Sequence, residues 1–184
     1  MVCEISDNMK VLAISGSNRI GNTEAMLREV LRGTKTNTEL IRLADLKIKH
    51  CAAVCDCFER GRPCVIKDDM KKVLDKLVEA DIVVLGSPNY WMNVSGVMKD
   101  FMDRTNPLFS EMLLKRKKLG IVCVGGQPLS NVKFCEDSIK RFAEDHKMKL
   151  IDSVIASADE AGEVKKNKKI MKKCFDLGKK LMKN

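Results

Sequence analysis

The feature that most constrains the fold is a series of five short apolar runs, separated by longer stretches of mixed polarity. The runs are rich in Val, Ile and Leu and occupy residues 10–15, 39–43, 81–88, 119–126 and 149–156. The third run, DIVVLGSP, is apolar without polar alternation, which is typical of a strand buried on both faces. Strands of this kind predict a parallel sheet.

Amphipathic helices are predicted between and after these runs, because apolar residues recur there every three or four positions. They centre on residues 25–31, 70–78, 94–102, 132–146 and 171–182. Five strands that alternate with five helices predict an α/β protein with a doubly wound parallel sheet between two layers of helices. The length of 184 residues suits one domain over residues 1–184.

Composition and charge argue against membrane and nucleic-acid partners. No run of about 18 apolar residues is present to span a bilayer, and the first ten residues lack the layout of a signal peptide. The net charge is +9, but nine of the 34 basic residues are lysines between Lys165 and Lys183, spread around one predicted helix. A solvated helix face explains them better than a nucleic-acid site. We expect a cytoplasmic protein.

The loop after the first predicted strand is one residue away from an ATP-binding P-loop. Gly16 to Thr23 fits G-x-x-x-x-G-K-[ST], except that Asn22 replaces the lysine. A triphosphate needs that lysine and usually a metal, and Asn18 breaks the dinucleotide pattern G-x-G-x-x-G. A loop that enters a helix still presents backbone N–H groups to an anion. A phosphate monoester, as in FMN, is the best fit, and a polar turn without a ligand is the alternative.

Two more predicted strands end in residues suited to a ligand. Ser87–Gly96 follows the third strand and Gly125–Gln127 follows the fourth. Ligands of doubly wound sheets bind beyond the carboxyl ends of the strands, near the point where the winding reverses. Tyr90 and Trp91, the single Tyr and Trp of the chain, supply flat surfaces there. Ordinary surface or interface packing of this pair is the alternative.

Four sequence blocks resemble the NADPH-dependent FMN reductase family and, within it, the iron-sulfur flavoproteins known mainly from anaerobic archaea and bacteria. The blocks are SGSNRIGNT (15–23), CVIKDDM (64–70), ADIVVLGSPNYWMNVSGVMKDFMDR (80–104) and GGQ (125–127). The resemblance implies a flavodoxin-like fold and bound FMN. It also implies a 4Fe-4S cluster on a compact cysteine motif, and homo-oligomers, dimers or tetramers, whose active site lies at a subunit interface.

The resemblance also implies roles for single residues. The FMN phosphate would be held by Ser15, Ser17, Arg19, Asn22 and Thr23, and the isoalloxazine ring would be lined by Pro88, Asn89, Tyr90, Trp91, Asn93, Gly125, Gly126 and Gln127. No catalytic side chain is predicted, because the flavin itself carries the redox chemistry. Lys99, Asp103 and Arg104 belong to a resembling block, but their helical position predicts a structural or interface role.

Residues 46–66, after the second predicted strand, are too irregular for an ordinary connection and predict an insertion. They hold four of the eight cysteines, Cys51, Cys55, Cys57 and Cys64, spaced C-x3-C-x-C-x6-C. The family motif is close to C-x2-C-x2-C with a fourth cysteine five to seven residues later, so Cys55 is displaced by one residue. Four thiolates suit a 4Fe-4S cluster, which takes one sulfur per iron. A zinc site and thiols that are reduced or paired are the alternatives.

The sequence therefore predicts an FMN-dependent oxidoreductase that moves electrons between FMN, a cysteine-ligated cluster and an external donor or acceptor. The expected partners are a small redox protein such as ferredoxin, or NAD(P)H or a quinone. A cluster-free NAD(P)H-dependent flavin or quinone reductase is the first alternative. A flavodoxin-like electron carrier is the second, although carriers of that kind usually dock through an acidic face and the pI here is about 9.2.

Overall fold

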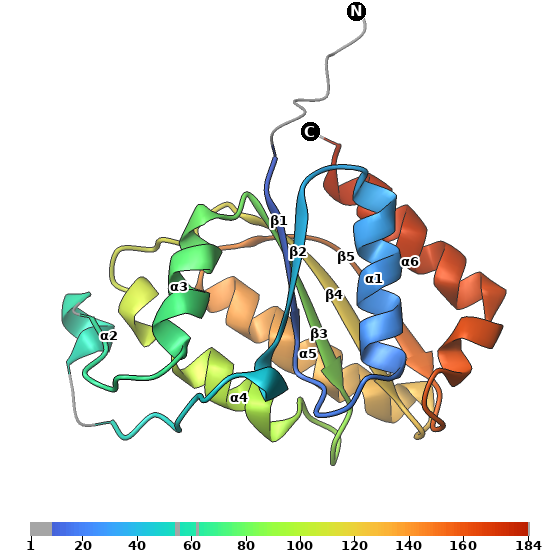
Figure 1. The fold of residues 1–184 in the computed structure, drawn as a ribbon, viewed down its shortest axis with the longest axis horizontal. Coiled ribbons are helices and arrows are strands. Elements are labelled where there is room, and N and C mark those ends of the chain that lie inside the picture. The colour runs from blue at the N-terminus through green and yellow to red at the C-terminus, as the bar shows by residue number, and fades with distance from the viewer. Residues whose placement is uncertain (1–8, 54–55, 62, 184) are drawn as a thin grey trace, which may run out of the picture.

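The computed structural model describes residues 9–53, 56–61 and 63–183. Its five strands are all parallel and form one sheet in the order β2-β1-β3-β4-β5 (Figure 1). The strands are β1 Val11–Ser15, β2 Thr38–Arg42, β3 Ile82–Pro88, β4 Lys118–Gly125 and β5 Lys149–Ser157. This is the flavodoxin-like order, and it confirms the predicted doubly wound sheet.

Five long helices confirm the helical stretches, and one short helix was not predicted. The helices are α1 Asn22–Thr34, α2 Cys57–Arg60, α3 Met70–Glu79, α4 Gly96–Asp103, α5 Leu129–Asp145 and α6 Lys168–Leu181, with 3-10 turns η1 Leu43–Asp45, η2 Asn106–Leu108 and η3 Glu163–Lys166. The short helix, α2, is a single turn within the cysteine-rich segment, too brief to leave a periodic pattern. No helix in the described part of the chain has the length and apolar character needed to cross a membrane.

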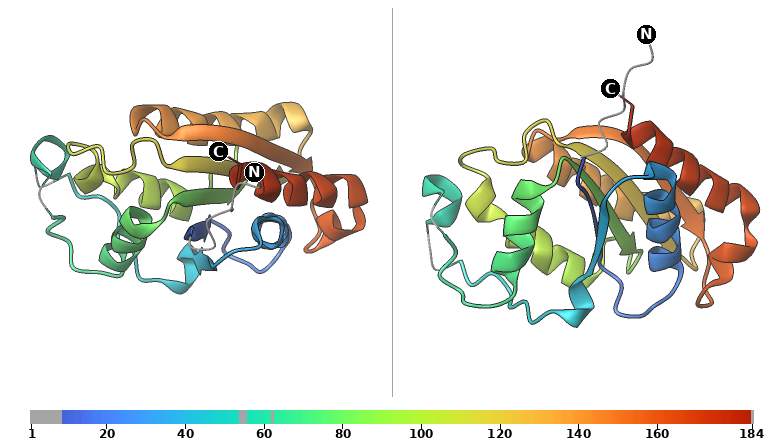
Figure 2. Two further views of the ribbon diagram at one scale, coloured as in Figure 1. Left: turned by 90° about the horizontal axis from the view of Figure 1, so that it is seen from above. Right: turned by 45° about the horizontal axis from the view of Figure 1, so that its top comes forward.

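Two apolar cores lie on opposite faces of the sheet. Val83 and Leu85 of β3 pack with α3, α4 and α5, whereas Ile82 and Val84 pack with α1 and α6. Alternate residues of one strand therefore serve both cores, which explains why the strand sequence is apolar without alternation. The further views show the sheet running between its helices (Figure 2).

The contact between α1 and α6 is unusually close. A Cβ added to Gly33 would lie 2.2 Å from the Phe175 carbonyl oxygen, and one added to Gly178 would lie 2.1 Å from the Val30 carbonyl oxygen. The two helices therefore touch backbone to backbone at paired glycines. This contact fixes the axis of α1, whose first turn enters the site described below.

The cysteine-rich segment lies away from this helix pair. After β2 and η1 the chain runs outward to α2 and returns to α3, so that α2 and α6 lie at opposite ends of the molecule (Figure 1). Phe58 of α2 stacks on Phe109, with ring centroids 4.4 Å apart and planes 14° from parallel. This stacking attaches the segment to the turn that follows η2.

Candidate functional site

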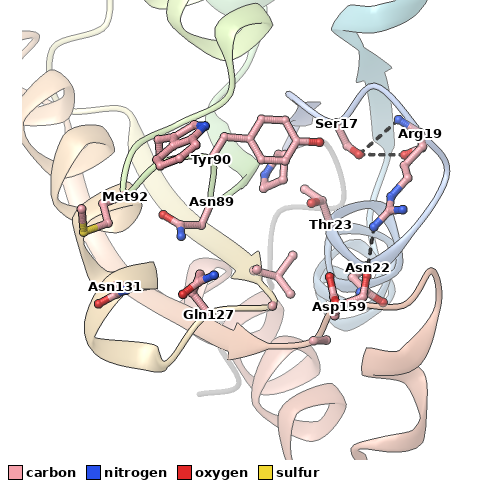
Figure 3. Close-up of a pocket in the computed structure, with 16 residues that line it drawn as sticks. Ser17, Arg19, Asn22, Thr23, Asn89, Tyr90, Met92, Gln127, Asn131 and Asp159 are labelled. Atoms are coloured by element: carbon pink, nitrogen blue, oxygen red, sulfur yellow. Dashed lines mark hydrogen bonds between the residues drawn. The ribbon is translucent and has the colours of Figure 1, made fainter.

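A cavity of about 630 Å³ opens where β1, β3, β4 and β5 end. Its volume is typical of a small-molecule site, and it adjoins β1 and β3, between which the winding of the sheet reverses. Figure 3 shows its lining. The lining residues are Ser17, Arg19, Asn22, Thr23, Pro88, Asn89, Tyr90, Trp91, Met92, Val124, Gly125, Gly126, Gln127, Asn131, Ala158 and Asp159.

The cavity brings together all but two of the thirteen residues predicted to hold FMN. Ser15 is fully buried under the first loop, residues 16–21 between β1 and α1, where its Oγ accepts the Ser17 N–H over 3.4 Å. Asn93 lies in the second loop, residues 89–95 between β3 and α4, and its Oδ1 accepts the Val94 N–H over 2.8 Å. These two residues shape the loops without lining the cavity. Direct contact of any of the thirteen with a ligand stays a prediction.

The first loop is fixed by contacts with the start of α4. A Cβ on Gly16 would lie 2.7 Å from the Met98 Cβ, so only glycine fits this approach. Ser95 Oγ donates a hydrogen bond of 2.6 Å to the Gly16 carbonyl and accepts the Met98 N–H over 3.2 Å as the N-cap of α4. Within the loop, Ser17 Oγ donates to the Arg19 carbonyl over 2.7 Å. The loop is therefore shaped before any ligand arrives.

The first turn of α1 offers backbone donors to the cavity. The N-cap residue Gly21 provides no side-chain cap, in contrast to Ser95 on α4 and Asn167 on α6. The first N–H groups of a helix have no partner within the helix, and they lie at the positive end of its dipole. Asn22 and Thr23, in this turn, line the cavity. The arrangement suits an anion such as a phosphate monoester.

The Asn22 side chain joins the first turn of α1 to the segment after β5. Its Nδ2 donates to the Glu160 carbonyl over 2.8 Å, and its Oδ1 accepts the Val164 N–H over 3.1 Å. Arg19 Nη2 also donates to the Asp159 carbonyl over 3.0 Å (Figure 3). The first loop is thus joined to the segment after β5. With its side chain held in this way, Asn22 has its backbone N–H and the second Nδ2 hydrogen left for a ligand.

The second loop is a tight turn with strained residues at its tip. Tyr90 and Asn93 exchange backbone hydrogen bonds of 2.9 and 3.0 Å, and Trp91 and Met92 between them have φ of 49° and 57°. Left-handed backbone is costly for residues other than glycine. Trp91 is 98% exposed, and Tyr90 is 44% exposed. Figure 3 shows Tyr90 and Asn89 across the cavity from Arg19.

A buried polar atom at the cavity lacks a partner. Asn89 is only 8% exposed, and its Oδ1 has no hydrogen-bond partner among the described residues. Leaving such an atom unpaired costs about 1–3 kcal/mol. A ligand that carries a donor at this point removes the cost.

The cysteine-rich segment presents its thiols unevenly. Cys57 is buried and Cys51 and Cys64 are partly buried, while Cys55 lies outside the described residues. In the described parts of the chain, no three His, Cys, Asp or Glu side chains gather into a group that could hold a metal ion. Four thiols are the right donors for an iron-sulfur cluster. The three described thiols are not assembled into a ligand set in this structure.

A buried ion pair lies at the base of this segment. Arg104 Nη1 and Nη2 donate to the two carboxylate oxygens of Asp68 over 2.7 and 3.0 Å, and the two side chains are 1% and 3% exposed. Burial opposes both charges, but the mutual hydrogen bonds prevail, so the pKa of Arg104 is raised and that of Asp68 is lowered. Arg104 has the structural role that its helical position predicted. Lys99 and Asp103 form an exposed pair on the same helix.

Comparison with known proteins decides the family. The model of the NADPH-dependent FMN reductase family matches residues 9–163. The chain belongs to this family. An iron-sulfur flavoprotein of Methanocaldococcus jannaschii is 38% identical over 147 residues, which cover 78% of this chain and 76% of the relative. An FMN-dependent NADPH-azoreductase of Staphylococcus aureus is 28% identical over 160 residues, 83% of this chain and 82% of that one.

Solved structures agree on the fold. A flavone reductase matches with a TM-score of 0.76 at 22% identity over 95% of this chain, which spans 62% of that protein. The predicted family, fold and oxidoreductase class are thus confirmed, and the chain is an FMN-binding redox protein. FMN fits the cavity on three observations, namely its volume, the uncapped first turn of α1 and the unpaired Asn89 oxygen.

Sequence reasoning missed five residues of the cavity lining, which are Met92, Val124, Asn131, Ala158 and Asp159. Ala158 and Asp159 come directly after β5, so the rule that ligands bind beyond strand ends could have found them. Asn131 lies in the first turn of α5, where polar residues also serve as ordinary capping residues. Met92 and Val124 are apolar, so a search for polar residues and glycines at strand ends does not single them out.

Proposed function

We propose that the protein is an iron-sulfur flavoprotein that moves electrons between FMN, a 4Fe-4S cluster and an external redox partner. FMN occupies the cavity at the strand ends, and Cys51, Cys55, Cys57 and Cys64 supply the cluster ligands. The observation that carries the proposal is the pairing, in one chain, of a flavin-sized cavity with a four-cysteine segment. The archaeal relative at 38% identity is itself named an iron-sulfur flavoprotein.

Residues of the first loop hold the phosphate end of FMN in this proposal. Backbone N–H groups of α1 face the phosphate, and Thr23 adds a neutral hydroxyl donor from the same wall of the cavity. Ser17 keeps the loop in shape through its hydrogen bond to the Arg19 carbonyl. Arg19 adds a positive charge at the rim and stays attached to the Asp159 carbonyl. Charge-assisted hydrogen bonds of this kind are strong, and together they suit a monoester without a metal.

The opposite wall holds the flavin ring. Pro88, Asn89 and Tyr90 line one side and Gly125–Gln127 line another, and the Asn89 side chain pairs with a polar edge of the ring. Bound FMN exchanges electrons in pairs or singly, depending on its partner. The task of these residues is to orient the ring and to exclude water from one of its faces.

A second copy of the chain completes the site in our proposal. Trp91 is 98% exposed beside the cavity, and Ile20 of the first loop is 71% exposed. Large apolar side chains exposed together mark interaction surfaces, and symmetric homo-oligomers are the commonest assemblies of soluble proteins. The external electron donor or acceptor in this proposal is a ferredoxin-like protein, or NAD(P)H or a quinone.

Anaerobic purification tests the proposed function. The expected product is brown, with one FMN and four iron and four sulfide ions per chain, the stoichiometry of one 4Fe-4S cluster. The matched control is a variant with Cys57→Ser and Cys64→Ser, which keeps FMN and loses the iron. A chain that binds FMN without iron or sulfide after anaerobic reconstitution would overturn the cluster, and a chain without FMN would overturn the whole proposal.

Two observations favour a second candidate, a cluster-free NAD(P)H-dependent reductase. The described thiols are not gathered into a metal-binding group, and the azoreductase relative matches over 83% of this chain. Stoichiometric FMN, no iron and fast oxidation of NAD(P)H with a quinone or azo dye as acceptor would support this candidate.

A further inference from the structure

The two limbs of the cysteine-rich segment meet at its base. Lys47 N–H donates to Asp69 Oδ2 over 3.0 Å, and Asp69 N–H donates to the Lys47 carbonyl over 3.2 Å. Lys49 N–H donates to Asp68 Oδ2 over 2.9 Å. The outgoing limb, residues 47–49, and the returning limb, residues 68–69, are thus paired. The segment that carries the four cysteines is a loop closed by this pairing.

Arg104, at the end of α4, joins both limbs to the body of the protein. Its Nη1 donates to the Lys49 carbonyl on the outgoing limb and to Asp68 Oδ2 on the returning limb, each over 2.7 Å. Its Nη2 donates to Asp68 Oδ1 over 3.0 Å. One planar guanidinium therefore fixes the separation of the two limbs, a geometry that a lysine ammonium cannot reproduce.

The guanidinium also lies near Cys64. The two residues line the same cavity, and Cys64 is among the groups that raise the pKa of Arg104. Arg104 Nε is buried and has no hydrogen-bond partner among the described residues. A spare buried donor beside a thiol suits a sulfur that carries negative charge, as a metal-bound cysteine sulfur does.

Stability alone does not explain such a pair. Replacing a buried ion pair with apolar residues of similar volume is often neutral or stabilising, whereas removing one partner is strongly destabilising. A buried pair that joins the two limbs and lies near a thiol instead fixes where the limbs lie relative to each other. The functional element that this pair would hold in place is the cysteine-rich segment.

We propose that Arg104 is a positioning residue for the cluster. It holds the two limbs of the cysteine-rich segment together through Lys49 and Asp68, and it donates a hydrogen bond from Nε to the Cys64 sulfur once that sulfur binds iron. The inference rests on the proposed cluster. It implies that Cys64 is the cluster ligand whose position Arg104 fixes.

The test compares Arg104→Met and Arg104→Lys with Lys99→Met, which removes only the exposed Lys99–Asp103 pair on the same helix. After anaerobic reconstitution, we expect Arg104→Met to hold iron about tenfold more weakly, the usual effect of losing an outer partner of a metal ligand. Arg104→Lys should recover part of the loss. The cluster that does form in Arg104→Met should have a more negative reduction potential and an altered EPR spectrum, because the hydrogen bond and positive charge at sulfur are gone.

A second readout separates this inference from the proposed function. In the apo-protein, trypsin cleavage between residues 49 and 67 should rise about tenfold in Arg104→Met over Lys99→Met, because cleavage follows the population of the open segment. FMN affinity should not change, since Arg104 does not line the FMN cavity. This readout works even if the wild-type chain holds no iron.

Unchanged cleavage, or unchanged iron affinity and potential, would overturn the inference. Where Arg104→Met fails to fold, the double variant Arg104→Met with Asp68→Leu removes both buried charges and takes its place. If the double variant also loses its fold and FMN, the pair is a stability element and the inference is wrong.

Discussion

At the scale of single residues, the site depends on side chains that join its loops to distant parts of the chain. Ser95 joins the first loop to α4 through the Gly16 carbonyl, and its own N–H donates to Ser87 Oγ over 3.0 Å. Asn22 joins the same loop to the segment after β5. The loop that faces the phosphate is therefore held from two sides by hydrogen bonds between distant parts of the chain.

We expect Ser95→Ala to lower the free energy of unfolding by about 1–3 kcal/mol, because it removes a helix cap and leaves the buried Gly16 carbonyl without its donor. FMN affinity should fall as well, since the first loop loses an anchor. Urea denaturation and FMN fluorescence titration measure the two effects. Ser130→Ala, at an exposed serine of α5, is the matched control, and an equal effect of both changes would contradict the prediction.

Buried thiols should resist alkylation in the folded protein. Burial raises the pKa of the Cys123 thiol and raises that of Cys174 to about 12, and only the thiolate is a nucleophile. In the apo-protein at pH 8, iodoacetamide and peptide mass spectrometry should find Cys51 and Cys64 modified first. Cys123 and Cys174 should react only after urea is added. Early modification of Cys123 would contradict its place in the core.

The buried His146 should make stability depend on pH. Burial lowers the pKa of His146 from 6.5, so below pH 6.5 the unfolded chain binds more protons than the folded one. The free energy of unfolding should therefore fall as the pH drops through 6.5, by up to about 1.4 kcal/mol per pH unit until the folded pKa is reached. The pKa of His50 is raised, so His50 affects the free energy of unfolding in a separate pH range, above pH 6.5.

His146→Phe tests this dependence, because a phenyl ring can pack against Phe142 and Phe109 at the tilted and edge-on angles that the imidazole has and cannot titrate. Thr105 Oγ1 keeps its hydrogen bond to the Met102 carbonyl. Between pH 6.5 and about pH 5, the slope of stability against pH should be smaller in the variant than in the wild type. Equal slopes by chemical denaturation would show that other groups cause the dependence.

At the scale of elements, helix packing places the first turn of α1 at the cavity. The predicted stripes of α1 and α6 found the apolar faces that enter the core. They did not find the glycine crossing, because an apolar pattern marks a buried face and does not tell how closely two backbones approach. Segment 46–66 shows the opposite case. Its cysteine pattern marked it as special, but the contacts of Arg104 with its two limbs depend on the end of α4, which lies further along the chain.

Gly178→Ala should separate α1 from α6. The added methyl would lie 2.1 Å from a backbone oxygen, so the helices must move, and we expect a loss of about 3 kcal/mol and a fall in Tm of about 6–12 °C. Differential scanning calorimetry measures the change. Gly96→Ala is the control, since nothing lies within 4 Å of its added methyl. Similar Tm values for the two variants would contradict the close crossing.

At the scale of the whole molecule, the cavity and the cysteine-rich segment occupy different regions around one sheet, and the exposed Trp91 adjoins the cavity. Because Trp91 is the single Trp of the chain, intrinsic fluorescence reports on this surface alone. The proposed second copy would cover it. The 98% exposure describes the isolated chain.

We therefore expect acrylamide to quench Trp fluorescence efficiently at dilutions where light scattering shows monomers, and poorly where it shows oligomers. Trp91→Ser should shift the equilibrium toward monomers, because burial of a large aromatic surface is lost. Lys179→Ser on α6 is the control. Oligomers whose Trp91 remains fully accessible to acrylamide would contradict an interface at this surface.

The sheet, its five long helices and the loops at its carboxyl edge could all be predicted from the amino-acid sequence. These features depend on apolar periodicity and on loop motifs, which are properties of neighbouring residues. The tertiary structure sets which groups in those loops remain available to a ligand, because the partners of Asn22 lie up to 142 positions away. Away from those loops, it places Arg104 against Lys49 and Asp68. A buried amide or guanidinium forms hydrogen bonds with the carbonyl or carboxylate groups that the fold brings near it. These partners cannot be identified from the residues next to it in the sequence.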